Sequence, residues 1–283
     1  IDKWNTNGAS YVWVQVPRVV DTNTFIYAYW GYVTNGPPAG ATNGSTWANG
    51  FKAVWHLGQG GTRPDSTTND YNGVPEANVA VTDAAQIGDA DIFSGTGSGY
   101  SANGSVSNGN VSVTLDQTIE FWIYAHNAFN NGLRQNLITK AYGGEGSIVV
   151  ETNPPPTGAY VNYYWGVSGN DSAPYQTISS GTIAATFPSN TWSHLALVRD
   201  LSSASRTVRW YLNGVLMTNI AAFAGLANTS NMPLYLGKGW VTPFQGRLDE
   251  VRMSTTARSS NWVWACWANQ GSNSTFNSYG PCS

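Results

Sequence analysis

Two adjacent carboxylates, Asp249 and Glu250, lie in the segment FQGRLDEVRMS and could catalyse a reaction, bind a metal or stabilise a strand. The segment reads as a β-strand with Val251 and Met253 facing the core, which places Asp249 on the same inward side. Glu250 and Arg252 are then expected on the outer face, where they can form an ion pair. Retaining glycosidases need two carboxyl groups about 5–5.5 Å apart. Neighbours on opposite faces of a strand are therefore not expected to form such a pair.

An inward carboxylate is unfavourable unless it is neutralised or well hydrogen-bonded. Asp249 could accept hydrogen bonds from the backbone of a neighbouring loop, or it could be a ligand of a hard cation. The loop RPDSTTNDYNG supplies Asp65 and Asp70, and calcium requires several such oxygen ligands. The same loop could instead be a series of Asx turns. We predict calcium with Asp249, Asp65 and Asp70 as ligands, and the turn alternative remains open.

The remaining candidates for catalysis are isolated in the sequence. His56, His126 and His194 each stand alone in an aromatic or apolar segment, and Glu120 stands alone in TIEFWIY. None has the spacing of a metal site, and no set of nucleophile, histidine and acid can be read from spacing. The sequence therefore predicts a protein that is not an enzyme.

Several aromatic residues have the character of a sugar-binding site, which combines exposed rings with amide and carboxylate groups. Trp240 and Phe244 lie in LGKGWVTPFQG, a Gly/Pro-rich segment where rings are less often part of a core. Tyr160, Asn162 and Tyr164 alternate along GAYVNYYWG and so share one face of a strand. We predict these five residues as the ligand-binding set.

The composition limits the classes of partner. Of the 283 residues, 41% are hydrophobic and 10% are charged, and the net charge is −3. An acidic chain with no cluster of Lys or Arg is not expected to bind nucleic acid. No apolar run reaches the roughly 18–20 residues that cross a membrane, so membrane insertion is not expected either.

The distribution of β-branched and aromatic residues predicts an all-β fold, an antiparallel two-sheet jelly-roll sandwich with one short C-terminal helix and an added N-terminal β segment. The helix is expected to begin after Ser259 or Ser260 and to close one end of the core. The Pro/Gly-rich residues 34–50 predict a boundary between an N-terminal β segment with its linker (1–50) and a main domain (51–283). Strands are expected at residues 11–16, 25–30, 51–57, 118–125, 159–166, 192–199, 207–214 and 247–253.

The two cysteines, Cys266 and Cys282, both lie near the end of the chain. Two free thiols are one possibility, but the segment between them has little apolar content to hold it in place. A disulfide would stabilise it by about 3 kcal/mol in the chain-entropy model. We predict this disulfide and, with it, an oxidising compartment outside the cytoplasm.

Five segments resemble, in this order, the strands of laminin-G-like jelly rolls of the concanavalin A-like lectin/glucanase superfamily. They are LDQTIEFWIYAH, NTWSHLALVRD, RWYLNGVLM, PLYLGKG and FQGRLDEVRMSTTARSSNW, and the resemblance covers roughly residues 51–270. Residues 4–31 resemble the C-terminal part of a small bacterial β domain of unknown function. The superfamily resemblance implies two curved sheets, often calcium and frequently glycan binding. It also implies that hydrolases of this fold carry Glu at i and i+4 around an Asp, a spacing that this chain lacks.

We therefore predict a secreted, non-catalytic binding or adhesion module, whose partner is a polysaccharide or a cell-surface glycan. One alternative is a structural subunit of an extracellular filament or surface assembly, in which residues 1–33 exchange strands with identical subunits. A second alternative is a glycan-cleaving enzyme of the same fold.

Overall fold

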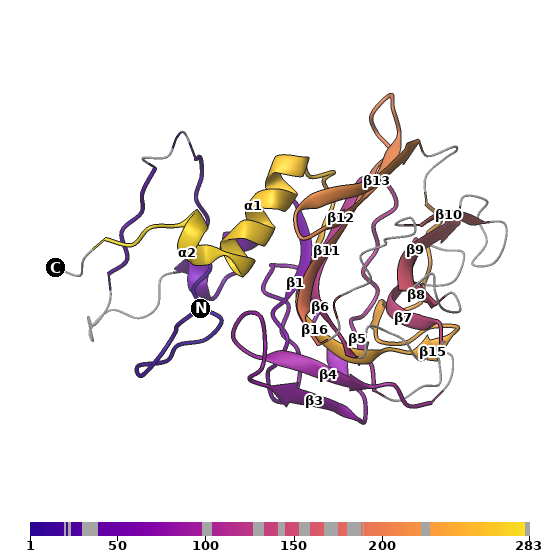
Figure 1. Ribbon diagram of the computed structural model, residues 1–283, viewed down its shortest axis with the longest axis horizontal. Coiled ribbons are helices and arrows are strands. Elements are labelled where there is room, and N and C mark those ends of the chain that lie inside the picture. Colours follow the sequence, from indigo (N-terminus) through magenta and orange to yellow (C-terminus); the bar gives the residue numbers. More distant parts are fainter. Residues whose placement is uncertain are drawn as a thin grey trace.

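Two sheets, mainly antiparallel, contain all the strands that the computed structural model describes (Figure 1). The strand and helix boundaries below refer to the described part of the chain. The structure describes residues 1–19, 21, 24–29, 39–97, 104–126, 133–140, 145–152, 159–166, 175–179, 188, 190–221 and 227–280.

The first sheet, here called sheet I, has β16 near its centre and the paired β12 and β13 at one edge. β1 pairs with the C-terminal half of β16, beside β4. The strands, in spatial order, are β3 (Val79–Thr82), β4 (Ala90–Ser94), β16 (Gln245–Ser254), β6 (Gln117–Ala125), β11 (Trp192–Asp200), β12 (Thr207–Leu212) and β13 (Val215–Ala221), with β1 (Phe51–Trp55) off this path.

The second sheet, sheet II, is antiparallel except for the short β15, which runs parallel to β7. Its strands, in spatial order, are β2 (Val74–Pro75), β5 (Val106–Ser107), β14 (Tyr235–Leu236), β7 (Gln135–Lys140), β8 (Gly146–Thr152), β9 (Ala159–Gly166) and β10 (Tyr175–Ser179), with β15 (Thr242–Pro243) off this path.

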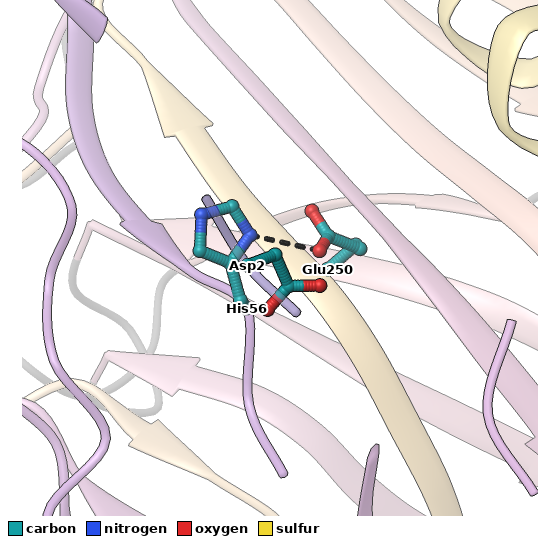
Figure 2. A group of neighbouring side chains, drawn as sticks. All are labelled: Asp2, His56 and Glu250. Carbon is teal, nitrogen blue, oxygen red and sulfur yellow. Dashed lines mark hydrogen bonds and ion pairs between the residues drawn. The ribbon is translucent and has the colours of Figure 1, made fainter. Parts of the chain in front are cut away.

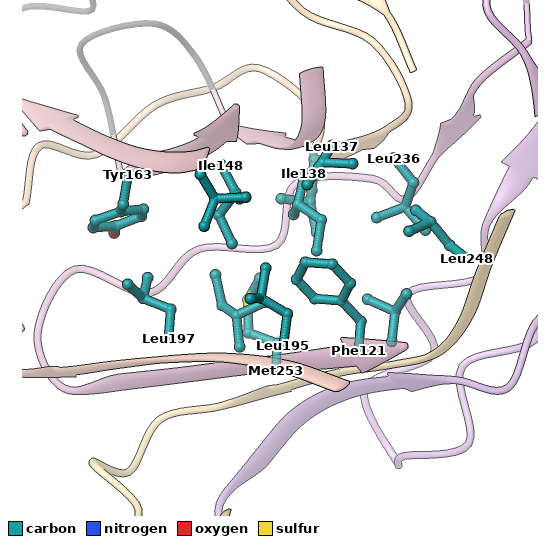
Figure 3. Packing of buried hydrophobic residues seen from close by; sticks show 14 of the residues in the cluster. Phe121, Leu137, Ile138, Ile148, Tyr163, Leu195, Leu197, Leu236, Leu248 and Met253 are labelled. Atoms are coloured by element: carbon teal, nitrogen blue, oxygen red, sulfur yellow. The ribbon is translucent and has the colours of Figure 1, made fainter. Parts of the chain in front are cut away.

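The hydrophobic core fills the space between the two sheets. Figure 3 shows Phe121, Leu195 and Leu197 of sheet I facing Ile148 and Tyr163 of sheet II, and all five are buried. These residues occupy alternate positions along their strands, as a sandwich requires. Burying each large apolar side chain contributes about 1.5–3 kcal/mol. The predicted all-β sandwich is confirmed.

The C-terminal helix begins where the sequence predicts but covers a different surface. The backbone N–H of Trp262 donates to the Ser259 hydroxyl at 3.2 Å and caps α1 (Ser260–Gly271). Val263 packs against Ala196 and Tyr211, which point away from the core, so α1 lies on the outer face of sheet I (Figure 1). The prediction that α1 closes one end of the core is wrong, because its apolar side packs on a hydrophobic patch on the outer face of β11 and β12. The other helical segments are η1 (Ala39–Ala41), η2 (Ser45–Trp47) and α2 (Asn273–Phe276). No helix in the described part of the chain is long and apolar enough to cross a membrane.

The N-terminal segment does not form the two predicted strands. Tyr11 makes an isolated bridge to Lys3, and the described residues of 11–16 and 25–30 belong to no ladder. High β-propensity describes how well a residue fits a paired surface, and no neighbouring strand pairs with this segment. Instead, Trp13 lies over the outer face of sheet I, where its ring stacks on His56.

The predicted disulfide is not supported. Cys266 is a free cysteine, half-buried on α1, and Cys282 lies outside the described residues. The prediction of an oxidising compartment depended on this disulfide, so the structure does not support it.

Candidate functional site

A β-bulge on β16 places both Asp249 and Glu250 on the outer face of sheet I. Asp249 lies opposite Trp122 on β6 and Arg252 lies opposite Glu120, so two residues of β16 stand against Phe121 alone. Glu250 has a φ of 52°, in the left-handed region. The extra residue shifts the alternation, so Leu248, Val251 and Met253 enter the core while Asp249, Glu250 and Arg252 face outward. The predicted inward position of Asp249 is wrong for this reason, as is the prediction that the two acids lie on opposite faces.

Asp249 accepts hydrogen bonds from the backbone of a neighbouring loop. Its Oδ2 accepts from the N–H groups of Gln86 at 3.0 Å and Ile87 at 2.8 Å. Burial, followed by the charge of Glu250, raises the pKa of Asp249 well above its usual value. Of the two alternatives for this residue, the hydrogen-bonded one is present in the structure.

The Glu250 carboxylate lies between the imidazole of His56 and the guanidinium of Arg252. Its Oε1 is 2.8 Å from Nδ1 of His56, and its Oε2 accepts from Nη2 of Arg252 at 2.6 Å. Burial opposes ionisation, but the charges of His56 and Arg252 outweigh it and lower the pKa of Glu250. The predicted ion pair between Glu250 and Arg252 is confirmed.

Two tryptophans cover this part of sheet I. The Trp13 ring is stacked on His56 with centroids 5.9 Å apart, and the Arg252 guanidinium lies 4.2 Å from the centre of the same ring. Trp47 of η2 packs beside them, 5.6 Å from His56. The N-terminal segment and η2 therefore help to cover the polar residues around the bulge.

Glu120 and His194 extend the polar group along β6 and β11. Glu120 lies 3.9 Å from Arg252 and 3.8 Å from Nε2 of His194. Burial raises the pKa of Glu120, while burial and the charge of Arg252 lower the pKa of His194 to about 3. The buried polar cluster consists of Asp249, Glu250, Arg252, His56, Glu120 and His194. Sequence reasoning treated Glu120 and both histidines as isolated, although their outward positions in aromatic strands were a usable signal.

The residues predicted to bind calcium do not come together. The carboxylate of Asp65 is occupied by four local hydrogen bonds, three of them from the backbone N–H groups of Val54, Thr67 and Tyr71. Asp70 is exposed and accepts from the side-chain amide of Asn72 at 2.6 Å. The Asx-turn alternative therefore describes this loop, and the described residues assemble no site from Asp249, Asp65 and Asp70. Calcium binding by the chain stays a prediction.

The predicted sugar-binding residues on β9 do share one face, the outer face of sheet II. Val161 and Tyr163 point into the core, so Tyr160, Asn162 and Tyr164 point outward. Tyr160 is half-buried, whereas Asn162 and Tyr164 are buried.

An ion pair that the sequence did not indicate adjoins these residues. Arg134 donates to both carboxylate oxygens of Glu151, at 2.5 Å and 2.7 Å. The Tyr164 hydroxyl donates to Glu151 at 2.6 Å. Burial and, after it, the bond to Glu151 raise the pKa of Tyr164, and burial and the charge of Glu151 raise that of Tyr160. Both phenols therefore remain protonated hydrogen-bond donors at neutral pH.

Trp240 belongs to the same surface and Phe244 does not. The Trp240 ring meets Tyr164 edge-on, with centroids 5.7 Å apart, and is half-buried. Phe244 is fully buried in the core, 5.7 Å from Phe93, so its predicted exposure is wrong. The reason is local: β15 pairs with β7, and the N–H of Phe244 donates to the carbonyl of Gly237, which turns the ring inward. We call Tyr160, Asn162, Tyr164, Trp240, Arg134 and Glu151 the aromatic face.

Two packed antiparallel sheets of this kind define a β-sandwich of the jelly-roll type. Residues 94–264, more than half of the chain, match the laminin G family model of the concanavalin A-like lectin/glucanases superfamily. The chain belongs to this superfamily. No curated protein sequence gives a significant match.

Solved structures show the same fold at low sequence identity. The binding domain of Paraclostridial Mosquitocidal Protein 1 matches with a TM-score of 0.60 and 14% identity, covering 78% of this chain and 52% of that one. The binding domain of botulinum neurotoxin serotype D gives 0.57 and 12%, covering 78% and 52%. Domain 4 of AbnA, a GH43 extracellular arabinanase from Geobacillus stearothermophilus in complex with arabinotriose, gives 0.57 and 19%, covering 76% and 96%. The match thus spans about half the length of the toxin domains and nearly all of the arabinanase domain.

Proposed function

We propose that this chain is a secreted, non-catalytic module that binds a polysaccharide or cell-surface glycan at the aromatic face. The observation that carries the proposal is the proximity of the half-buried Trp240 ring to the Arg134–Glu151 ion pair, with Tyr164 in contact with both. Such rings cover the apolar side of a sugar, while guanidinium and carboxylate groups bind its hydroxyls. Because Tyr164 and Asn162 are buried, they support the surface, and Trp240, Tyr160 and Arg134 make the contacts.

The similar structures are consistent with this proposal. One is an arabinanase domain in complex with a trisaccharide, and two are binding domains of toxins. The arabinanase is described as extracellular. For this chain, an extracellular location gives access to the polymers that such a module would bind.

The acids of sheet I support a non-catalytic module. Asp249 and Glu250 share a face because of the bulge, but they are only 0% and 1% exposed. A glycosidase must bring two carboxyl groups to opposite sides of a glycosidic bond. A polysaccharide has no access to acids that are buried in this way.

Binding to a glycan array, with arabinotriose as a defined probe, tests the proposal. Trp240→Ala is expected to weaken binding by roughly 2 kcal/mol, about thirtyfold, as for a central aromatic contact. Trp264→Ala is the matched control, because Trp264 is 49% exposed on α1, on the opposite side of the sandwich, and is expected to leave the affinity unchanged. Repeating the titration in EDTA tests the predicted calcium dependence.

Two results would contradict the proposal. One is the absence of binding to every glycan on the array, and the other is release of cleavage products from a bound glycan. Equal loss of affinity in both tryptophan variants would move the site away from the aromatic face.

A second candidate function is assembly with identical subunits through the N-terminal segment. Phe25, Tyr27 and Tyr29 alternate along this segment, are mostly exposed and contact one another in sequence. A row of exposed rings on an extended segment is suited to pairing with another chain. Concentration-dependent light scattering and electron microscopy test this candidate, and a monomer at all concentrations would exclude it.

A further inference from the structure

Three segments that are distant in the sequence place metal-ligating atoms together next to the bulge. Asp2 comes from the N-terminal segment, His56 follows β1, and Glu250 is the bulge residue of β16 (Figure 2). One ligand atom from each side chain lies within 4.8 Å of those of the other two. The described part of the chain contains no other such group. The site is separate from the aromatic face, which lies on the other sheet.

Two buried carboxylate oxygens at this place lack a hydrogen-bond partner. Oδ2 of Asp2 is one, and Oδ1 of Asp249 is the other, although Asp249 is 0% exposed. Asp249 lies beside Glu250 on the same outer face of sheet I. Buried polar atoms in proteins are normally paired, so unpaired acceptors indicate a missing donor or cation.

The local charges also favour a cation. Asp2, Asp249 and Glu250 are three carboxylates, and Arg252 is the cation that contacts one of them directly. A divalent ion would accept electron pairs from carboxylate oxygens that Arg252 does not contact.

We propose that Asp2, His56 and Glu250 bind a divalent transition-metal ion of the zinc type, which ties the N-terminal segment to sheet I. The inference is independent of the proposed glycan function.

The distances suit such an ion after a small adjustment. Zinc binds histidine nitrogen and carboxylate oxygen at about 2.0–2.2 Å, so its ligand atoms lie roughly 3.3 Å apart in a tetrahedron. His56 Nδ1 and Glu250 Oε1 are 2.8 Å apart and must separate slightly, while the half-buried Asp2 side chain moves inward. A water molecule would occupy the fourth position, as in zinc sites with three protein ligands.

The surrounding residues orient two of the ligands. Arg252 holds Oε2 of Glu250 and leaves Oε1 directed at His56, while Trp13 fixes the plane of the imidazole. Hydrogen-bonded ligands of this kind are typical of zinc sites. An imidazole ligand also favours zinc, cobalt or nickel over calcium, which takes six to eight oxygen ligands.

Titration of the metal-free protein with Zn²⁺ by calorimetry, and with Co²⁺ by absorption, tests the proposal. We expect one ion per chain, and at least tenfold weaker binding in Asp2→Asn. Asp70→Asn is the matched control, because Asp70 is an exposed carboxylate from the loop predicted to bind calcium. It should bind Zn²⁺ as the wild type does. Bound Co²⁺ should quench the fluorescence of Trp13 and Trp47, which lie next to His56, and Trp13→Phe should reduce the quenching.

A proteolysis experiment reports on the same ion without a spectroscopic probe. Arg18 is an exposed trypsin site in the N-terminal segment. Zn²⁺ should slow cleavage there in the wild type and in Asp70→Asn but not in Asp2→Asn. The proposal is overturned if the wild type binds neither ion at millimolar concentration, if Asp2→Asn retains the full affinity, or if Asp70→Asn abolishes binding. Since Asp2 is half-buried and belongs to neither sheet, its substitution should not prevent folding, and a circular dichroism spectrum checks this.

Discussion

Replacing Asp249 by alanine should destabilise the protein much more than replacing it by asparagine. In Asp249→Ala the N–H groups of Gln86, which is half-buried, and Ile87, which is buried, lose an acceptor whose side chain is fully buried. An unsatisfied buried group costs about 1–3 kcal/mol, so two of them cost about 2–6 kcal/mol. This is a large part of a total stability of about 5–15 kcal/mol.

Asp249→Asn should keep most of that stability. The amide oxygen can accept from both N–H groups, and the amide nitrogen replaces Oδ1, which has no partner in the described part of the structure. We expect a loss of about 1–3 kcal/mol, smaller than that of Asp249→Ala, since both backbone donors keep their acceptor and only the amide nitrogen is left unsatisfied.

Urea unfolding followed by tryptophan fluorescence, in EDTA, measures these differences from the shift of the midpoint at constant slope. Asp116→Ala is the matched control. Asp116 also accepts two backbone N–H groups, from Leu201 and Ser202 at 3.0 Å each, but Ser202 is exposed and water can replace the acceptor. Because Leu201 is buried, Asp116→Ala should cost at most one unsatisfied group, about 1–3 kcal/mol. The reasoning is refuted if Asp249→Asn costs as much as Asp249→Ala, or if Asp249→Ala costs no more than Asp116→Ala.

Three further predictions concern other buried groups. His194 has its pKa lowered to about 3, so its neutral form stabilises the fold at neutral pH and this contribution is lost as the pH falls from about 6.5 towards 3. Between pH 7 and pH 4.5, His194→Gln should lose about 2–3 kcal/mol less stability than the wild type, because it has no imidazole to protonate in the unfolded state. Glu120, at 3.8 Å, is too distant to stabilise the imidazolium of the folded wild type by a hydrogen bond. Parallel urea-unfolding profiles for variant and wild type would contradict this. Arg63→Met should cost about 3–5 kcal/mol in urea unfolding, because it leaves the fully buried Asp91 with the N–H of Gly58 but without a cation, and adding Asp91→Asn should recover part of the loss. Gly146→Ala should lower the melting temperature strongly, because φ is 141° and a Cβ would lie 2.1 Å from the Tyr163 hydroxyl, whereas Gly60→Ala, in open space, should be mild.

Much of the fold can be predicted from the sequence because long strands contain runs of β-branched and aromatic residues that are typical of strands. The predicted strands at 118–125 and 192–199 correspond to β6 and β11, within a residue at each end. Other strands were not predicted, since segments such as β7 (QNLITK) mix polar and apolar residues without alternation. The N-terminal strands failed for the opposite reason. Their composition is typical of strands, but a ladder needs a neighbour, and composition contains no information about the neighbour.

The sites were less predictable because they depend on single backbone events. Alternation along β16 is interrupted by one residue, and glutamate is not a residue type that marks a left-handed conformation. Phe244 lies in a loop-like sequence whose short pairing with β7 turns it inward. Tyr160, Asn162 and Tyr164 were placed correctly on one face because β9 is regular throughout, so alternation alone determined their orientation.

The bulge in β16 directs polar side chains to the outer face of sheet I, and the N-terminal segment covers them there. Without the bulge, β16 would direct one acid outward and the other into the core, where a carboxylate is unfavourable. With it, both acids are on the back of sheet I, at the expense of a left-handed Glu250, a conformation that costs about 1–3 kcal/mol unless the surroundings hold it. His56 and Arg252 hold the side chain, and Trp13 and Trp47 cover those two residues. By covering His56 and Arg252, the N-terminal segment also removes Asp249 and Glu250 from water. Burial raises the free-energy cost of a negative charge on these two acids. Asp2, on the same segment, brings a third acidic group next to Asp249 and Glu250. Burial alone disfavours a third acid at this place, whereas a bound cation needs acidic ligands.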